Sequence, residues 1–252
     1  MKNTISLLIM CKDEFIKVKN IIKSLENVVN DVVVVVTGNT IVKSTGAYKI
    51  LYYPWHDDYS APLNAGLRLC ASKWIFRIDT DEEIDDINKD KIVKAVNNYD
   101  VFGFNAKQRG YLPNDRKELG VKRIPPYKGY SFAVDDRCCR LFRNDPRIFY
   151  EFNTHETIYN SLERCGFELL NTDLTIHHWG KLDMEDKAPY YYQLAKERLI
   201  KYPEDYQSYY YLGVAADFIG NKKEAYNVFK KGFDKYQTNY YKIPMEFLKQ
   251  QL

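Results

Sequence analysis

A run of five valines at residues 32–36 constrains the fold of this chain more than any other stretch. Each valine is β-branched and apolar, so the run favours a strand that is buried on both of its faces. Strands of this kind lie inside parallel sheets, whose strands are joined by crossover helices. The turn at residues 37–40 ends the run. We therefore expect an α/β fold with the valine run inside a parallel sheet.

The surrounding sequence repeats this alternation of strand and helix. Further strands are predicted by apolar runs, and helices by 3.6-residue periodicity. The predicted strands cover residues 5–10, 50–53, 74–78, 101–106, 140–143, 148–150 and 175–178, and the predicted helices cover residues 15–25, 61–71 and 85–97. Residues 107–136 show little periodicity and are predicted to form a long substrate-facing loop. In a doubly wound sheet of this type, ligands bind at the carboxyl ends of the strands.

The pattern becomes entirely helical after Lys181. Residues 183–202 and 208–236 are predicted helices, interrupted at Pro203 and Gly220. The spacing of small and aromatic residues in the second segment is that of one tetratricopeptide repeat. One repeat cannot bury its apolar face alone, so we expect it to pack on the first domain, a second copy or another protein. The predicted domains are an α/β domain, residues 1–182, and a helical domain, residues 183–252.

Composition excludes several functional classes. A net charge of +3 over 252 residues does not indicate a nucleic-acid-binding protein. The apolar runs are too short for a membrane span or a secretory signal. Five cysteines without paired metal-ligand spacing are typical of reduced thiols. We expect a soluble cytoplasmic protein, with peripheral membrane contact left open.

Two carboxylates, Asp79 and Asp81, follow the predicted strand at residues 74–78. Oxygen ligands at this spacing suit a hard divalent cation such as Mg²⁺ or Mn²⁺. The alternative is the acidic start of a helix, where carboxylates are favoured by the helix dipole. The position at the carboxyl end of a buried strand favours the cation.

With these features, the sequence resembles family 2 glycosyltransferases of the GT-A fold. The resemblance covers roughly residues 4–235, and it is carried by an ordered set of motifs. They are "SLLIMCKDE", "DVVVVVTGNT", "YYPWHDDYSAPLNAGLRLCASKWIFRIDTDEE", "RLFRND", "HETI" and "IHHWGK". The chain is most similar to the branch with C-terminal tetratricopeptide repeats. That branch includes lipopolysaccharide-core glycosyltransferases and the enzymes that glycosylate cysteine in glycocin peptides.

The resemblance implies a role for each matching residue. Asp81 would bind the metal that bridges the donor diphosphate, and Asp79 would hold the ribose or the metal shell. His178 would complete that shell, and an imidazole suits Mn²⁺ better than Mg²⁺. Glu156 would be the catalytic base of an inverting reaction, oriented by His155. The alternatives are that His178 only packs and that Glu156 is an exposed helix residue.

The resemblance also implies a set of nucleotide contacts. These residues are Met10, Cys11, Lys12, Glu14, Thr37, Asp58, Asn64, Asp79 and Arg140. Arg140 or Arg143 would pair with phosphate or with the acids of the site. Departures from the family pattern concern the same region: Val36 and Ile41 stand where acids are common, Leu63 replaces an arginine, and Lys73 replaces an aspartate.

These observations predict a metal-dependent, inverting glycosyltransferase that uses a nucleotide-sugar, a UDP-sugar by preference, with Mn²⁺ or Mg²⁺ as its cofactor. The acceptor would be a saccharide, a lipid or a peptide. The alternative is a catalytically inactive GT-A protein that recruits a partner through its helical tail, which the missing acids favour. A nucleotidyltransferase is the third hypothesis, and the lack of a Gly- and Lys-rich phosphate loop argues against it.

Overall fold

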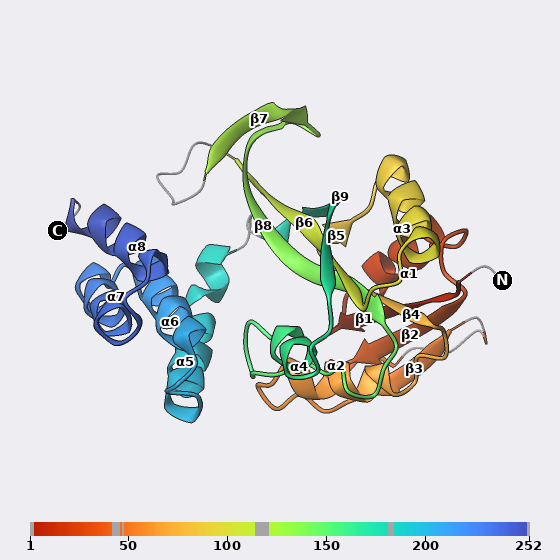
Figure 1. Cartoon of the computed structure of the whole chain (residues 1–252), viewed down its shortest axis with the longest axis horizontal. Coiled ribbons are helices and arrows are strands. Elements are labelled where there is room, and N and C mark those ends of the chain that lie inside the picture. The colour runs from red at the N-terminus through yellow and green to blue at the C-terminus, as the bar shows by residue number, and fades with distance from the viewer. Residues whose placement is uncertain (1–2, 42–45, 47, 114–120, 181–183, 251–252) are drawn as a thin grey trace. The chain divides into compact units, whose positions relative to one another are not determined.

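The computed structural model describes residues 3–41, 46, 48–113, 121–180 and 184–250 (Figure 1). The chain forms two compact units, one within residues 1–115 and 121–181 and the other within residues 182–252. The predicted domain boundary between residues 182 and 183 lies outside the described residues. It therefore stays a prediction.

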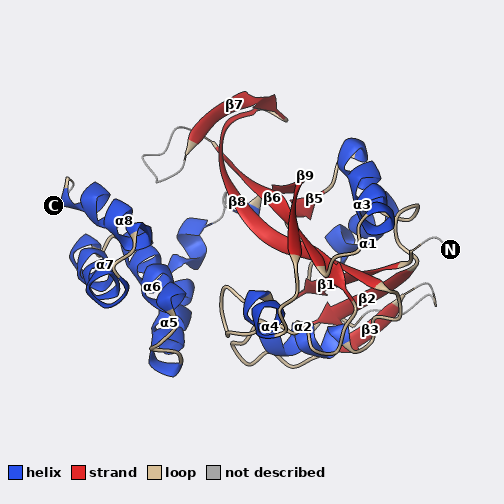
Figure 2. Cartoon of the chain, viewed as in Figure 1, coloured by secondary structure: helices blue, strands red, loops and turns tan. Residues whose placement is uncertain are grey.

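A mixed sheet forms the centre of the first unit (Figure 2). Its strands are β1 (Ile5–Cys11), β2 (Asp31–Val36), β3 (Lys49–Tyr52), β4 (Trp74–Asp79), β5 (Glu82–Glu83), β6 (Gly103–Leu112), β7 (Lys122–Tyr127), β8 (Tyr130–Arg143) and β9 (Leu169–His178). They follow the order β3-β2-β1-β4-β8-β6-β9-β5, and β7 pairs with β8 outside this path. Strands β3, β2, β1 and β4 are parallel, whereas β8 runs antiparallel to β4 and β6. The valine run lies in β2, between β1 and β3, so the α/β prediction is confirmed.

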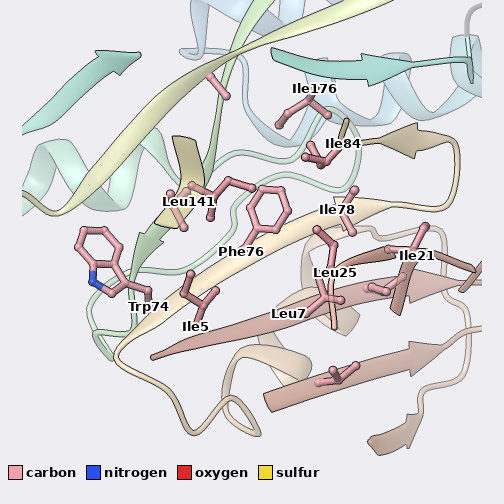
Figure 3. Packing of buried hydrophobic residues seen from close by; sticks show 14 of the residues in the cluster. Ile5, Leu7, Ile21, Leu25, Trp74, Phe76, Ile78, Ile84, Leu141 and Ile176 are labelled. Atoms are coloured by element: carbon pink, nitrogen blue, oxygen red, sulfur yellow. The ribbon is translucent and has the colours of Figure 1, made fainter. Parts of the chain in front are cut away.

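Helices cover both faces of this sheet. They are α1 (Phe15–Ser24) and α3 (Asp86–Asn98) on one face, and α2 (Ser60–Leu67) and α4 (Tyr159–Arg164) on the other (Figure 1). The side chains of β1 contribute to the hydrophobic clusters on both faces of the sheet, because successive side chains of a strand point to opposite faces. Leu7 and Ile9 pack in the cluster with α1 and α3, drawn in Figure 3, while Leu8 packs with α2 and α4. This arrangement of a parallel half-sheet between helices fits the expected GT-A type of fold.

The strand register brings several chain segments to one edge of the sheet. Met10 pairs with Asp79, and Cys11 pairs with Val36. The carboxyl ends of β1, β2 and β4 therefore lie side by side. This is the edge where the sequence predicts the ligand.

The prediction of a long loop over residues 107–136 is wrong where the structure describes this range, at residues 107–113 and 121–136. Strand β6 extends to Leu112, and β7 and β8 form a hairpin that turns at Lys128 and Gly129, both with positive φ. Charged side chains in this segment pair with each other across the sheet, as Arg109 of β6 does with Asp135 of β8. The segment therefore lacks the apolar run by which a strand is recognised in a sequence. The prolines of β7 are tolerated because that strand lies at the edge of the sheet.

One further predicted strand is wrong, and one helix was missed. Residues 148–150 form no strand. The side-chain amide of Asn64 holds the backbone of Tyr150 instead: it accepts a hydrogen bond from the N–H of Tyr150 at 2.7 Å and donates one to its carbonyl at 2.9 Å. Helix α4 was not predicted, because six residues are too few to show helical periodicity.

The second unit consists of the helices α5 (Met184–Lys201), α6 (Tyr206–Phe218), α7 (Lys222–Tyr236) and α8 (Asn239–Lys249). Glycines allow close packing at two contacts. A Cβ atom on Gly213 would lie 2.5 Å from the ring of Phe229, and one on Gly232 would lie 2.5 Å from the ring of Tyr241. The four helices confirm that the chain after residue 183 is helical, while the tetratricopeptide assignment stays a prediction. None of the described helices is both long and apolar enough to cross a bilayer.

We expect the substitution Gly213→Val to destabilise the helical unit. The added side chain would overlap the ring of Phe229, which is buried and cannot move away. Overpacking of this kind costs about 2 kcal/mol or more, which exceeds the gain of a few tenths in helix propensity. Urea denaturation followed by circular dichroism would measure the change. Lys230→Ala, an exposed substitution in α7, is the control, and equal stability of both variants would contradict the prediction.

Candidate functional site

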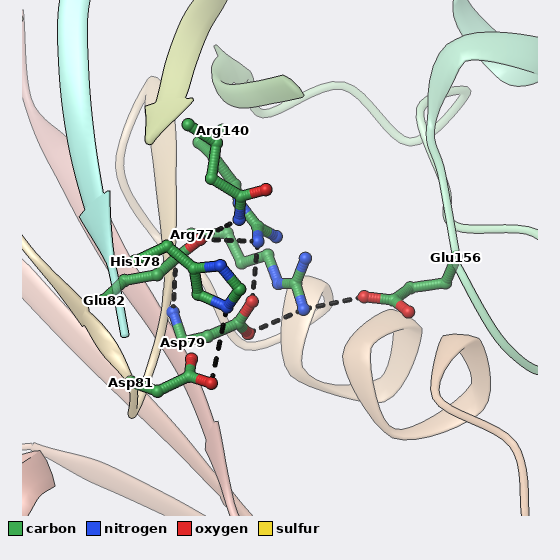
Figure 4. Close-up of polar contacts among 8 residues, drawn as sticks. Arg77, Asp79, Asp81, Glu82, Arg140, Glu156 and His178 are labelled. Carbon is green, nitrogen blue, oxygen red and sulfur yellow. Dashed lines mark hydrogen bonds and ion pairs between the residues drawn. The ribbon is translucent and has the colours of Figure 1, made fainter. Parts of the chain in front are cut away.

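The site begins at the end of β4, which brings Arg77 and Asp79 to the same face of the sheet because they are two residues apart. Arg77 Nη2 lies 2.7 Å from Asp79 Oδ1, and Arg140 Nη2 from the neighbouring strand β8 lies 2.6 Å from Asp79 Oδ2 (Figure 4). Both arginines are nearly fully buried. The predicted role of Arg140 as a partner for the acids of the site therefore agrees with its position.

Glu82 completes this buried cluster. Its carboxyl accepts a hydrogen bond from the backbone N–H of Asp79 at 2.8 Å and one from Gln108 at 2.5 Å, and it contacts Arg140 at 2.8 Å. Burial raises the pKa of Glu82 well above its usual value, and the charge of Asp79 adds to this effect. Burial also raises the pKa of Asp79 to about 6, despite the opposing effect of Arg77. Burial therefore disfavours the charged forms of both carboxyl groups.

Asp81 and His178 form the second part of the site. The pairing of β5 with β9 brings them together, and the backbone N–H of Trp179 donates to the carbonyl of Asp81 at 2.8 Å. Asp81 Oδ2 lies 3.4 Å from His178 Nε2. A Cβ atom on Gly180 would lie 2.1 Å from that oxygen and 2.7 Å from that nitrogen. Any side chain at residue 180 would therefore collide with both polar atoms, so glycine allows them to lie together.

This pair fits a divalent cation. Two ligands of one octahedral ion, each about 2.1 Å from it, lie roughly 3 Å apart when adjacent, and a small adjustment of Asp81 and His178 would reach that separation. Among the described residues, no group of three or more His, Cys, Asp or Glu side chains could hold a metal ion. Asp79, the third predicted ligand, is held by two arginines. The protein can thus offer two ligands and leave the other positions to water and phosphate.

Glu156 lies on a short, tightly turned loop. The backbones of Glu151 and Thr157 exchange hydrogen bonds of 2.9 and 3.1 Å, and between them Phe152 and His155 adopt positive φ angles of 76° and 49°. Glu156 Oε1 lies 2.7 Å from Arg77 Nη2, and its side chain is 11% exposed. Glu156 is therefore not an exposed helix residue. It points at the same arginine as Asp79 (Figure 4).

The nucleotide contacts predicted at the end of β1 surround a compact turn. Glu14 accepts hydrogen bonds from the backbone N–H groups of Lys12 and Asp13, at 3.0 and 3.1 Å. The Thr37 hydroxyl donates to the carbonyl of Cys11 at 3.2 Å. Burial raises the pKa of the Cys11 thiol to about 11, so this group is neutral at physiological pH. Met10, which precedes it, is partly buried.

Three other candidates have structural partners. Asp58 Oδ1 accepts from the backbone N–H groups of Ser60 and Ala61, at 2.8 and 3.0 Å, and so holds the start of α2. Asn64 holds the backbone of residue 150, as described above. Arg143 lies at the opposite end of β4, where it contacts Asp100 at 2.8 Å. The nucleotide contacts of Asp58 and Asn64 stay predictions, whereas Arg143 does not reach the acids of the site.

Sequence reasoning missed Arg77 and Glu82, whereas a packing or hydrogen-bonding role was one of the alternatives for His177 or His178. His177 is buried, with Nδ1 at 2.6 Å from the Tyr111 hydroxyl and Nε2 at 3.0 Å from Asp85, so it braces β9. The sequence did contain a signal for Arg77, which is the one charged residue before the aspartate in the apolar strand "WIFRID". A cation in such a strand requires a buried partner.

Comparisons with known proteins place the chain among remote relatives. No protein-family model matches it. It is 26% identical over 243 residues to a TPR repeat-containing protein of Synechococcus elongatus, covering 90% of this chain and 56% of the relative. It is 28% identical over 193 residues to an uncharacterized glycosyltransferase of Rickettsia felis, covering 75% of this chain and 62% of the relative. The chain thus spans less than two thirds of the length of either relative.

Similar solved structures share little sequence with the chain. The crystal structure of S. aureus TarS 1-349 in complex with UDP-GlcNAc is 11% identical, with a TM-score of 0.49, and the match covers 96% of this chain and 78% of that one. A 4-diphosphocytidyl-2C-methyl-D-erythritol synthase is 14% identical with a TM-score of 0.46, covering 69% of this chain and 89% of that one.

We expect Arg140→Met to destabilise the first unit by about 3–5 kcal/mol, because it leaves Asp79 and Glu82 buried without this cation. The control is Arg147→Met, which removes an arginine whose side chain is 60% exposed and should cost about 0–1 kcal/mol. Chemical denaturation of both variants at neutral pH would measure the difference. Equal unfolding free energies would show that the buried cluster does not depend on Arg140.

Proposed function

We propose that this chain is a glycosyltransferase that uses a nucleotide-sugar, with a UDP-sugar as the preferred donor. The observation that supports this most is the convergence of Asp81 and His178 beside the buried acids at the carboxyl edge of β4. The relative from Rickettsia felis, which bears the name of a glycosyltransferase, supports the same class of enzyme.

In this proposal, Asp81 and His178 would hold Mn²⁺ or Mg²⁺, cations that also accept phosphate oxygens of a nucleotide as ligands. The cation would offset the negative charge that builds up on the leaving nucleoside diphosphate. Arg140 adds a fixed positive charge near the same place. Asp79 is held between two guanidinium groups. Its proposed role is to accept a hydrogen bond from the ribose or to join the metal shell.

Glu156 is the proposed general base of an inverting transfer. It takes the proton of the acceptor while the acceptor atom forms a bond to the anomeric carbon, and the bond from that carbon to the diphosphate breaks on the opposite face. The acceptor is a saccharide, a lipid or a peptide. A carboxylate suits this role only if it is well placed, and the 2.7 Å contact with Arg77 holds Glu156 in position.

A catalytically inactive scaffold is the second candidate. The observation that favours it is the absence of acids at Val36 and Ile41. In that case, the helices of the second unit would bind a protein partner or a second copy of the chain, and the chain would bind no nucleotide. Calorimetry with UDP in the presence of Mn²⁺ separates the two candidates, since only the enzyme should show metal-dependent binding.

Asp81→Asn should weaken the binding of UDP in the presence of Mn²⁺ by about tenfold or more, because an amide is a poorer ligand than a carboxylate. Titration calorimetry with and without Mn²⁺ would measure the dissociation constants. Asp86→Asn, an exposed change in the first turn of α3, is the control and should bind like the wild type. Undiminished metal-dependent binding by the Asp81 variant would refute the metal site.

Glu156→Gln should lower kcat for sugar transfer by about 10²–10⁴-fold, since the amide cannot accept the proton of the acceptor. The dissociation constant of UDP with Mn²⁺ should change little, because the base does not contact the nucleotide. The release of UDP in a screen of nucleotide-sugars and acceptors would provide the rates. Glu163→Gln, an exposed change in α4, is the control. Full activity of Glu156→Gln would mean that another group is the base.

A further inference from the structure

We propose that Arg77 is a positioning residue that holds the general base Glu156 in place, and this inference rests on the proposed function. Arg77 lies in the middle of an interior strand whose other side chains, apart from the terminal aspartate, are apolar. A buried guanidinium at such a position costs free energy unless its partners repay it. Its partners should therefore reveal its role.

Arg77 has one partner on its own strand and one on a loop that is distant in the sequence. Its Nη2 atom lies 2.7 Å from Asp79 Oδ1 and 2.7 Å from Glu156 Oε1. The guanidinium lies 5.6 Å from the centre of the Tyr150 ring, and the arginine side chain is only 6% exposed. Arginine stays protonated under all physiological conditions, so this bridge carries a permanent positive charge. One cation thus links the strand of the donor acids to the loop of the base.

The base loop needs such an anchor. The ends of the loop, Glu151 and Thr157, are joined by one pair of backbone hydrogen bonds, and its middle is held by a bond from the backbone N–H of Tyr59 to the carbonyl of Asn153 at 2.9 Å. Two of its non-glycine residues have positive φ, and none of these backbone bonds fixes the Glu156 side chain. Such backbone conformations persist only when surrounding contacts hold them. Arg77 is the cation that pairs with Glu156 among the described residues. Without it, the carboxylate would lose its compensation and turn towards solvent.

The geometry separates this role from donor binding. Asp79 keeps Arg140 as a second cation when Arg77 is removed, whereas Glu156 keeps none of the described cations. Loss of Arg77 should therefore lower the rate of the chemical step more than the affinity for the nucleotide.

A double-mutant cycle on transfer activity tests the proposal with Arg77→Met, Glu156→Gln and the combination of both. We expect Arg77→Met to lower kcat by about 100-fold or more, while the dissociation constant of UDP with Mn²⁺ changes by less than about threefold. The double variant should be no slower than Glu156→Gln alone, because Arg77 acts through that residue. Arg143→Met removes a mostly buried arginine at the far end of β4 and should keep wild-type kcat.

Folding is checked by circular dichroism and by the binding of UDP. If Arg77→Met does not fold, the cycle is run with Arg77→Lys, which keeps the charge but loses the planar arrangement of donors. Multiplicative effects of the two substitutions on kcat, or an unchanged kcat in the Arg77 variant, would overturn the positioning role and leave the proposed function intact. A wild-type protein that binds no nucleotide and transfers no sugar would instead remove the proposed function, and this inference with it.

Discussion

The ion pairs around Asp79 are the interaction on which the rest of the site depends. Two guanidinium groups from adjacent strands, Arg77 and Arg140, hold one carboxylate at the carboxyl end of β4. Removing charges from water costs several kcal/mol for each ion, so this cluster is tolerated only because each group has close partners. It therefore orders the neighbourhood: Glu82 and Glu156 are placed by the same two arginines.

The apolar sheet makes this cluster possible. Valine-rich and leucine-rich strands fill both layers of the core, and the α/β architecture places the ends of β1, β2 and β4 at one edge. A cation or a carboxylate is acceptable there because the strand ends reach solvent on one side. Asp81 lies at this boundary, since its side chain is 34% exposed. An incoming nucleotide could reach it, while the arginines behind it stay dry.

The parts of the fold that local patterns encode were predicted from the sequence, and the parts that depend on distant pairing were not. The strands that become β1, β2 and β4 are continuous apolar runs, which explains why they were predicted. The hairpin of β7 and β8 was missed because its charged side chains pair across strands, as Lys122 does with Asp135. The meeting of Asp81 and His178 depends on the pairing of β5 with β9, which lies beyond local periodicity and was expected only from the resemblance to known enzymes. Arg77 was overlooked because its partner Glu156 is 79 residues away in the sequence, although a lone charge in an apolar strand requires such a partner.

The absent acids at the end of β2 are less damaging to a catalytic role than the sequence suggests. Asp13, at the end of β1, accepts hydrogen bonds from the backbone N–H groups of Asn39 and Thr40, at 3.1 and 3.0 Å, and from the Thr40 hydroxyl at 2.7 Å. The hydrogen bond from the Thr40 hydroxyl, together with those from the backbone of Thr40 and Asn39, lowers the pKa of Asp13 below its usual value. A carboxylate is thus present at this loop, although it comes from the neighbouring strand. The loop that would face the nucleotide keeps an organising negative charge, which weakens the argument for an inactive scaffold.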